Sequence, residues 1–351
     1  MKKYSFAFLF LLFASSQANA LSDLEISGEV DISATVWNLP TGERGNSAFN
    51  IPSLFLNFDA PLKDDNLLVL KLEGSEQQIN SDERFEVRVR EAYLDLVSVF
   101  SGMHALRVGL IPQTWQEAQY EQYGYRFLGT DAWAITEKWK YLNYSDLGIS
   151  FMSQLPADLG EWAFTLANGE GANEKEEGSQ KEAALFARFT LWSPLSVSFN
   201  YVRGSYDKYS GSAAVKERIQ ALVEYDKEDS FVAGLELLVT KDPADAISDL
   251  KMAEAVDVTD FLGQSVEGRA ASFYTVISTG PKAEVLLRYD YLDALANEDG
   301  KDLQTVLASL GYQVSEDIKA AFAVDYTRYA ENYAPGVRDR SKVELAAQVL
   351  F

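Results

Sequence analysis

The chain has 351 residues, no cysteine, one histidine and a formal net charge of −22 at pH 7. Without cysteine, disulfide bonds and thiolate metal sites are excluded. The acidic balance argues against nucleic acid as a partner, because phosphate binding needs clustered Lys and Arg. With His104 as the one histidine and no G-x-S-x-G or H-E-x-x-H motif, we expect no catalytic residues, no metal and no cofactor.

The first twenty residues have the pattern of a secretory signal peptide. Lys2 and Lys3 precede an apolar run over residues 6–14, and Ala18-Asn19-Ala20 supplies a small-x-small cleavage site. The apolar run is shorter than the ~20 residues that a membrane-spanning helix needs. We therefore expect residues 1–20 to be removed and residues 21–351 to form a single domain.

Apolar and polar residues alternate strictly from Leu24 to Val36. This stretch is longer than the ~5–6 residues of a typical strand and suits a transmembrane strand of ~9–11 residues with an apolar outer face and a polar lumen. The pattern changes phase near Arg90 and Glu91, which indicates either a β-bulge or a wrong assignment of the facing. Sixteen such strands are expected, around residues 23–36, 53–59, 67–73, 85–99, 106–110, 147–151, 162–166, 185–191, 195–201, 218–225, 231–239, 271–277, 284–291, 305–314, 318–327 and 342–351.

The connections between these segments alternate in length, apart from a short one at 79–83. Even strand numbers, short periplasmic turns and longer external loops are typical of bacterial outer-membrane barrels. We therefore predict an all-β fold, a sixteen-stranded antiparallel transmembrane barrel in the outer membrane of a Gram-negative bacterium, in contact with outer-membrane lipid and lipopolysaccharide. The longer connections are residues 39–48, 113–143, 168–181, 207–213, 241–268, 294–302 and 331–338.

The longest of these connections, residues 113–143, is rich in Trp and Tyr. Loops of this length are usually functional or disordered, and the aromatic content argues against disorder. Because a wide barrel leaves an aqueous channel, we predict that this loop folds inward and constricts the pore; the alternative is a loop packed over the rim. Its expected constriction residues are Glu117, Glu121, Arg126, Asp131, Glu137, Lys138 and Lys140.

The polar faces of the expected strands should line the lumen. Acidic residues outnumber basic ones there, and acidic rings favour cations whereas basic rings favour anions. Each of these residues could equally be a solvated wall residue without a selective role. The basic candidates for the pore lining are Arg88, Arg90, Arg107, Arg188, Arg218 and Arg288.

The connection 241–268 carries two further patterns. Between Pro243 and Phe261, apolar residues follow roughly helical spacing, which predicts a short helix. The acidic residues of the same connection lack the spacing and the glycine of a calcium loop, so we expect a solvated external surface. They are Asp242, Asp245, Asp249, Glu254, Asp257 and Asp260.

The last nine residues alternate again and end on Phe351. This segment resembles the closing strand of an outer-membrane barrel, whose terminal aromatic residue is a signal for the barrel assembly machinery. Phe351 is therefore the expected assembly signal.

Gly109 near the end of an expected strand is followed by Pro112 and by Glu117 at the start of an aromatic-rich loop. An Asn-Gly element and an Arg-bearing strand come later, with Asn168, Gly169, Gly171 and Arg188. In these elements residues 84–192 resemble the phosphate-selective porin O/P family. The resemblance implies sixteen strands and a homotrimer, and a basic ladder along the pore.

These observations predict a porin, a water-filled channel for passive diffusion of small ions and other hydrophilic solutes. An outer-membrane enzyme is disfavoured, because barrel lipases and proteases use histidine as a base, and the one histidine, His104, lies in an expected periplasmic turn. Two alternatives stay open: an anion- or phosphate-selective channel, and a structural barrel with a plugged lumen.

Overall fold

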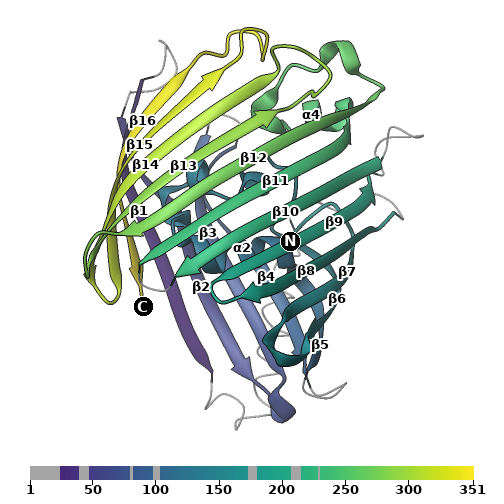
Figure 1. The fold of residues 1–351 in the computed structure, drawn as a ribbon, viewed down its shortest axis with the longest axis vertical. Coiled ribbons are helices and arrows are strands. Elements are labelled where there is room, and N and C mark those ends of the chain that lie inside the picture. The colour runs from purple at the N-terminus through teal and green to yellow at the C-terminus, as the bar shows by residue number, and fades with distance from the viewer. Residues whose placement is uncertain are drawn as a thin grey trace, which may run out of the picture.

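The computed structural model describes residues 24–38, 47–79, 82–97, 103–172, 180–206, 215–227 and 230–351, so the predicted signal peptide lies outside it. Sixteen antiparallel strands pair with their sequence neighbours, and β1 pairs with β16 to close a barrel (Figure 1). The strands are β1 (Glu25–Asn38), β2 (Ser47–Pro61), β3 (Leu67–Ile79), β4 (Asp82–Leu96), β5 (His104–Pro112), β6 (Ser145–Gln154), β7 (Gly160–Ala167), β8 (Glu182–Trp192), β9 (Leu195–Ser205), β10 (Val215–Lys227), β11 (Phe231–Pro243), β12 (Ser265–Ser278), β13 (Ala283–Asp293), β14 (Asp302–Ser315), β15 (Ile318–Tyr329) and β16 (Arg340–Leu350).

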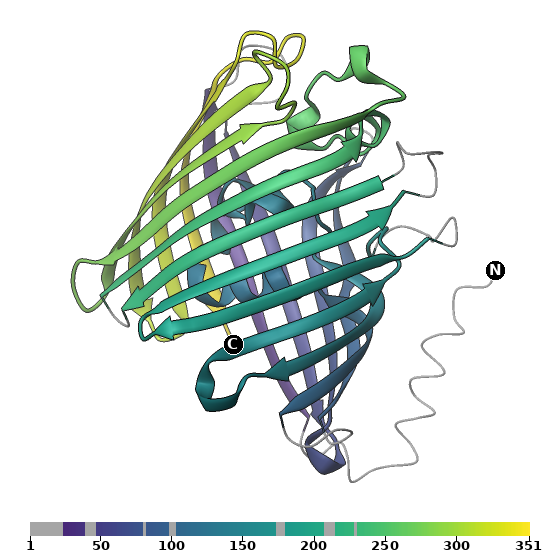
Figure 2. The same ribbon diagram turned by 45° about the vertical axis from the view of Figure 1, so that its right-hand side comes forward.

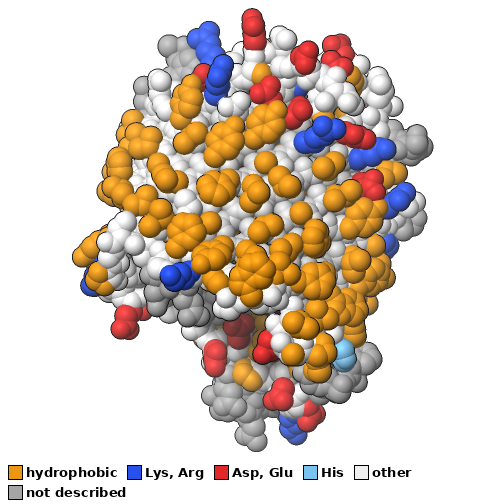
Figure 3. All heavy atoms as spheres, viewed as in Figure 1, with side chains coloured by type: hydrophobic (Ala, Val, Ile, Leu, Met, Phe, Trp, Pro, Cys, Tyr) orange, Lys and Arg blue, Asp and Glu red, His pale blue; other side chains and the backbone are white. Residues whose placement is uncertain are grey.

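Alternation of side chains gives the barrel two different faces. On β14, Val306 and Leu310 point outward and are 49% and 61% exposed, whereas Thr305 and Ser309 between them are buried in the lumen. Such outward residues form an apolar band around the middle of the visible outer surface, with charged side chains gathered mainly above and below it (Figure 3). The facing predicted for β14 is therefore confirmed.

The β-bulge, one of the two alternatives for the phase change in β4, is confirmed as well. Lys71 of β3 pairs with Glu91, and the next residue, Leu72, pairs with Val89, so Arg90 is an extra residue in β4. As a result, Arg90 and Glu91 are both buried although they are adjacent in sequence. The bulge brings two oppositely charged side chains to the lumen at one level of the barrel.

The longer connections gather at one end of the barrel, called here the long-loop end, and the short turns at the other, the short-turn end (Figures 1 and 2). The third connection, residues 113–144, contains α2 (Thr114–Tyr123) and α3 (Ile135–Lys138), with two 3-10 helices between them, Arg126–Leu128 and Thr130–Ala132. The sixth connection, residues 244–264, begins with α4 (Ala244–Asp249), the short helix expected in this region. No helix in the described ranges is long and apolar enough to cross a membrane.

Candidate functional site: the third connection inside the barrel

The third connection enters the lumen directly after β5. Trp115 and Ala118 on α2 pack in one apolar cluster with Phe186 and Leu222, which face inward from β8 and β10. The indole Nε1 of Trp115 also donates a hydrogen bond to Glu236 on β11, at 3.3 Å. Helix α2 therefore lies against the inner wall, as the inward fold predicted for this loop requires.

An apolar stretch after α2 lines the next part of the wall. Tyr125, Phe127 and Leu128 belong to a buried cluster that includes lumen-facing residues of β12 to β16, among them Leu286 and Leu307. The Tyr125 hydroxyl donates to Glu284 on β13 at 2.7 Å. The connection thus follows the inside of the barrel from β8 past β13 toward the seam between β16 and β1.

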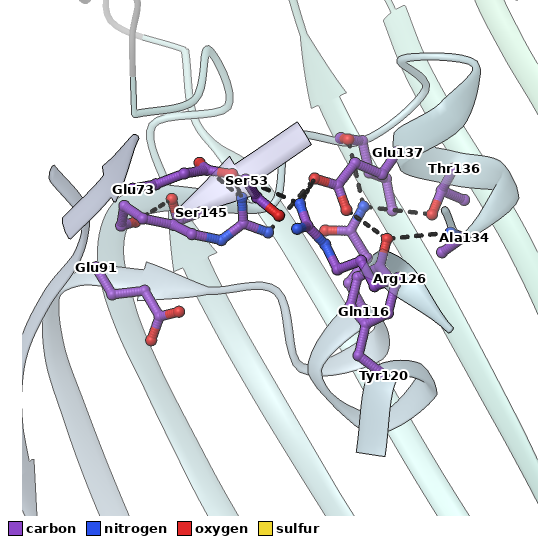
Figure 4. A network of polar contacts seen from close by, with 12 residues as sticks. Ser53, Glu73, Glu91, Gln116, Tyr120, Arg126, Ala134, Thr136, Glu137 and Ser145 are labelled. Atoms are coloured by element: carbon purple, nitrogen blue, oxygen red, sulfur yellow. Dashed lines mark hydrogen bonds and ion pairs between the residues drawn. The ribbon is translucent and has the colours of Figure 1, made fainter. Parts of the chain in front are cut away.

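A cluster of arginines and carboxylates crosses the lumen between the third connection and β3 and β4 (Figure 4). Arg126 pairs with Glu137 of α3 at 3.1 Å and with Glu73 of β3 at 3.6 Å. Arg90 pairs with the same two carboxylates, at 2.8 Å to Glu73 and 3.4 Å to Glu137. The Tyr120 hydroxyl, from α2, donates to Glu137 at 2.5 Å, so a single carboxylate joins both helices of the connection to the wall.

The charge state of Glu137 follows from this cluster. Burial raises the pKa of its carboxyl group, but the positive charges of Arg126 and Arg90 lower it more, and the resulting pKa is below the usual value for glutamate. Glu137 is therefore ionised at neutral pH and holds the two guanidinium groups in place.

A second cluster fastens the connection to β13 and β16. Asp131 pairs with Lys342 at 2.6 Å and with Arg340 at 3.2 Å. Lys138 pairs with Asp290 at 3.0 Å, and both side chains are almost completely buried. These pairs join residues more than 150 positions apart in the chain.

Two further acidic residues of α2 pair with the wall, and both are more exposed. Glu117 lies 3.0 Å from Arg107 on β5, and Glu121 lies 3.5 Å from Arg188 on β8. Their side chains are 31% and 63% exposed. Six of the seven predicted constriction residues therefore pair with lumen-wall residues; the exception is exposed Lys140, which forms no ion pair with any described residue.

The six arginines predicted to line the pore all face the lumen, and each lies beside a carboxylate. Arg218 is fully buried and pairs with Asp242 at 2.7 Å. Arg288 pairs with Asp290 and donates hydrogen bonds to the backbone oxygens of Ala132 and Trp133 in the third connection. The remaining four also pair with acids, at 2.7 Å for Arg88, 2.8 Å for Arg90, 2.8 Å for Arg107 and 3.5 Å for Arg188.

The third connection packs closely against the strands that it contacts. A cavity of about 10 Å³ remains between α2 and the wall, beside Gln119 and Glu236, which is room for about one water molecule. Each strand contributes at least one lumen-facing side chain that is at most 6% exposed: Asp31, Phe55, Glu73, Arg90, Ile111, Ser150, Thr165, Phe186, Asn200, Gln220, Glu236, Ser272, Leu286, Leu307, Asp325 and Glu344.

The apolar part of this wall was not predicted from the sequence. Leu286 and Leu307 share the lumen face of their strands with Arg288 and Ser309. A large apolar residue at a polar position of the alternation was the available signal, because such a residue needs a cover inside the barrel. Of the acidic residues expected on the external surface, Asp242 is buried against Arg218 and Glu254 pairs with Arg340 at 3.2 Å, so that expectation is wrong for these two.

Comparison with known proteins places this architecture among the porins. No protein-family model matches the chain, and no curated protein matches its sequence. Among solved structures, OprB of Pseudomonas putida is similar with a TM-score of 0.67 and 10% identity, covering 97% of each chain. An anion-selective porin from Comamonas acidovorans has a TM-score of 0.64 and 14% identity over 94% of this chain and 99% of that one. OmpT of Vibrio cholerae, in a trimer form, has a TM-score of 0.60 and 13% identity over 93% and 99%.

Proposed function

We propose that the protein is a channel of the Gram-negative outer membrane through which small ions and other hydrophilic solutes diffuse passively. The observation that supports this function is that a closed barrel with an apolar outer band has a charged connection across its lumen. A barrel of this size has room for an aqueous passage, and selectivity in such a passage follows from its width and wall charge. No catalytic group is required for this function.

The constriction is assigned to the third connection. Its ion pairs with β3, β4, β13 and β16 hold it at mid-height, so that a passing solute meets both acidic and basic groups. Glu117 and Glu121 are the most exposed of the six paired residues named above. We infer that these two carboxylates, with Arg107 and Arg188 opposite them, are the charges that a solute meets from the short-turn side.

Single-channel recording tests this function. The refolded mature chain would be placed in a planar bilayer under a salt gradient, and conductance steps and the reversal potential would be measured. We expect small steps and a cation-directed potential, because acidic residues outnumber basic ones on the lumen face. Glu117→Gln combined with Glu121→Gln should shift the potential toward anions. An unchanged potential would contradict the assigned role.

Anion or phosphate selectivity is the finer function implied by the resemblance to the porin O/P family. It would need basic groups free to bind a passing anion. Arg88, Arg90, Arg107 and Arg188 each lie beside a carboxylate, which favours the general channel. An anion-directed potential, with conductance blocked by phosphate, would support the phosphate-selective alternative instead.

A plugged structural barrel is the second candidate. Each of the sixteen strands has a lumen-facing side chain that is at most 6% exposed, which favours it, because water does not reach those parts of the wall. The recording separates the two functions: a folded barrel without any conductance steps would favour the plugged barrel.

The assembly of the protein is likewise proposed. We infer export by the signal peptide 1–20, recognition of Phe351 by the barrel assembly machinery, and contact of the outer surface with outer-membrane lipid and lipopolysaccharide. A homotrimer is supported by the trimer form of a porin of the same fold. Chemical cross-linking in native membranes would give a three-fold ladder for a trimer and a single band for a monomer.

A further inference from the structure

The sixth connection turns back into the mouth of the barrel at the long-loop end. Ile247 on α4 is 2% exposed, and Met252 and Ala253 further along are fully buried. Leu250, three residues after Ile247, is 44% exposed and points away from the barrel interior. The segment therefore has one apolar face that is covered and one that faces outward.

The wall beneath this segment has an unusual row of apolar residues. At mid-height, the lumen faces of β11 to β15 carry a polar row in direct register, which is Glu236, Ser272, Asp290, Thr305 and Thr327. One step nearer the long-loop end, the same five strands carry an apolar row, also in register, which is Leu238, Ala270, Leu292, Leu303 and Tyr329. The row stops at β10, where Gln220 pairs with Leu238.

An apolar row on a wet lumen wall would cost free energy, because it would stand in water. Here the row is covered. Leu238, Leu292 and Leu303 are at most 2% exposed and belong to a single cluster with Ile247 and Met252 of the sixth connection. Ile135, Trp139 and Tyr141 of the third connection belong to the same cluster, as do Leu295 and Tyr333 of the connections after β13 and β15. The sixth connection therefore packs on the wall and on the third connection together.

Polar contacts fasten the same three parts to one another. The backbone N–H of Ala253 donates to the carbonyl oxygen of Trp139 at 3.0 Å. Arg340 of β16 donates to Glu254 and to Asp131, at 3.2 Å each, so one guanidinium group holds both connections. The Tyr329 hydroxyl also donates to Glu254.

We propose that residues 244–264 are a second constriction of the channel: they close the long-loop mouth over β11 to β15 and hold the third connection against the wall. Solutes are then admitted only beside the remaining strands, and the sixth connection sets their upper size together with the third. This inference rests on the proposed channel function, but the seating of the segment can be measured without any conductance.

Cysteine accessibility measures that seating directly, because the chain contains no cysteine of its own. Ala270 on β12 is 5% exposed beneath the sixth connection, so Ala270→Cys reports whether the row is covered. The reagent is a charged maleimide, applied to the refolded barrel in detergent micelles. Glu267→Cys, at an exposed position on the same strand, is the positive control for labelling.

Ile247→Asp should release the segment, because it places a charge in the apolar cluster. We expect Ala270→Cys to be labelled faster by on the order of tenfold or more in this background. Leu250→Asp adds the same charge on the exposed side and should leave the labelling rate unchanged. Heat-modifiable migration on a gel would show that each barrel is folded.

A deletion variant provides a second test if the sixth connection of Ile247→Asp keeps its position or if that variant fails to fold. In it, residues 245–263 are replaced by a short Gly-Ser turn, which leaves β11 and β12 intact. Ala270→Cys that remains protected in this deletion variant would overturn the proposal. Fast labelling in the parent barrel would overturn it too.

Conductance and solute size then distinguish the second constriction from the channel function itself. We expect the deletion variant and Ile247→Asp to give larger conductance steps than Leu250→Asp, and to admit larger sugars in liposome swelling. Faster labelling of Ala270→Cys in the Ile247→Asp or deletion background, without conductance in any variant, would support the covering role of the sixth connection and refute the channel function. If the labelling of Ala270→Cys is unchanged in both variants and the wild-type protein conducts normally, the second constriction is refuted and the channel function is not.

Discussion

The aromatic ring of Phe351 lies directly over Gly28 at the seam where β16 meets β1. A Cβ atom at residue 28 would be 2.2 Å from the ring atom Cζ of Phe351, so only glycine leaves room for the ring. The two backbones also exchange hydrogen bonds, from Gly28 N to Phe351 O at 2.8 Å and from Phe351 N to Gly28 O at 3.0 Å. The terminal residue thus completes the pairing that closes the barrel.

Gly28→Val should weaken this seam, because the new side chain displaces the Phe351 ring. Overpacking of this kind costs about 1–3 kcal/mol. We expect a lower refolding yield and a lower midpoint of heat-induced unfolding in detergent. Ala34→Val, also outward-facing on β1, is the control and should behave as wild type. Adding Phe351→Ala to Gly28→Val should cost less than the two single changes summed; simple additivity would argue that the two residues do not interact.

Trp115→Ala should loosen α2 from the wall. Trp115 is 1% exposed and packs edge-on against Phe186, with ring centroids 6.3 Å apart. Losing a buried aromatic side chain costs about 3–5 kcal/mol, and we expect noisier, larger conductance steps together with a lower thermal midpoint. Trp115→Phe keeps the packing and removes the hydrogen bond to Glu236, so its effect should be about 1 kcal/mol. Equal effects of the two variants would contradict the expectation that packing contributes more than the hydrogen bond.

Asp290→Asn should release α3 from β13. The carboxylate pairs with Lys138 and Arg288, and all three side chains are nearly buried. Removing one partner of a buried ion pair costs about 3–5 kcal/mol, because the other charge is left uncompensated. We expect faster proteolysis within residues 113–144 and larger conductance steps. Glu267→Gln, at an exposed outward position on β12, is the control; a wild-type digestion rate for Asp290→Asn would count against the clamp.

The attachment of the third connection to the barrel wall should weaken at low pH. The folded-state pKa of Glu137 is lowered relative to its ordinary value of 4.5, because Arg126 and Arg90 outweigh the opposing effect of burial. Its stabilising contribution is therefore present above the unfolded-state pKa and is lost as pH falls through the lower, folded-state pKa. We expect a constant thermal midpoint from pH 7 to about 5 and a decrease below about 4.

Glu137→Gln tests this assignment. It should lower the thermal midpoint at pH 7, where the charge is lost, and should make the decrease below pH 4 shallower. Glu121→Gln, at a side chain 63% exposed, should keep the wild-type pH profile. An acid profile of Glu137→Gln that is identical to wild type would assign the decrease to other carboxylates.

Much of the architecture could be predicted because its signal is local. The alternation along β1 and the phase change at Arg90 and Glu91 each lie within one strand, and both are found as predicted. The inward fold of the third connection followed from its length and aromatic content. His104, expected in a turn, is instead the first residue of β5, two positions before the predicted start of that strand.

The ion pairs of the site could not be predicted in the same way. The sequence shows that Glu137, Lys138 and Asp131 are charged, but their partners on the wall come from β4, β13 and β16. The distance along the chain from Asp131 to Arg340 is 209 residues, and no local pattern relates two residues so far apart. The alternation of apolar and polar residues also does not show that the apolar row, which begins at Leu238 and ends at Tyr329, is covered by the third and sixth connections.

The barrel follows from the order of the residues, because each strand faces apolar surroundings on one side and polar ones on the other, and every second residue matches one of them. The content of the lumen depends instead on contacts between distant parts of the chain. Whether a connection stands in water or packs on the inner wall depends on complementary charges and apolar surfaces from distant strands, and these meet only after the barrel has closed and β1 lies beside β16.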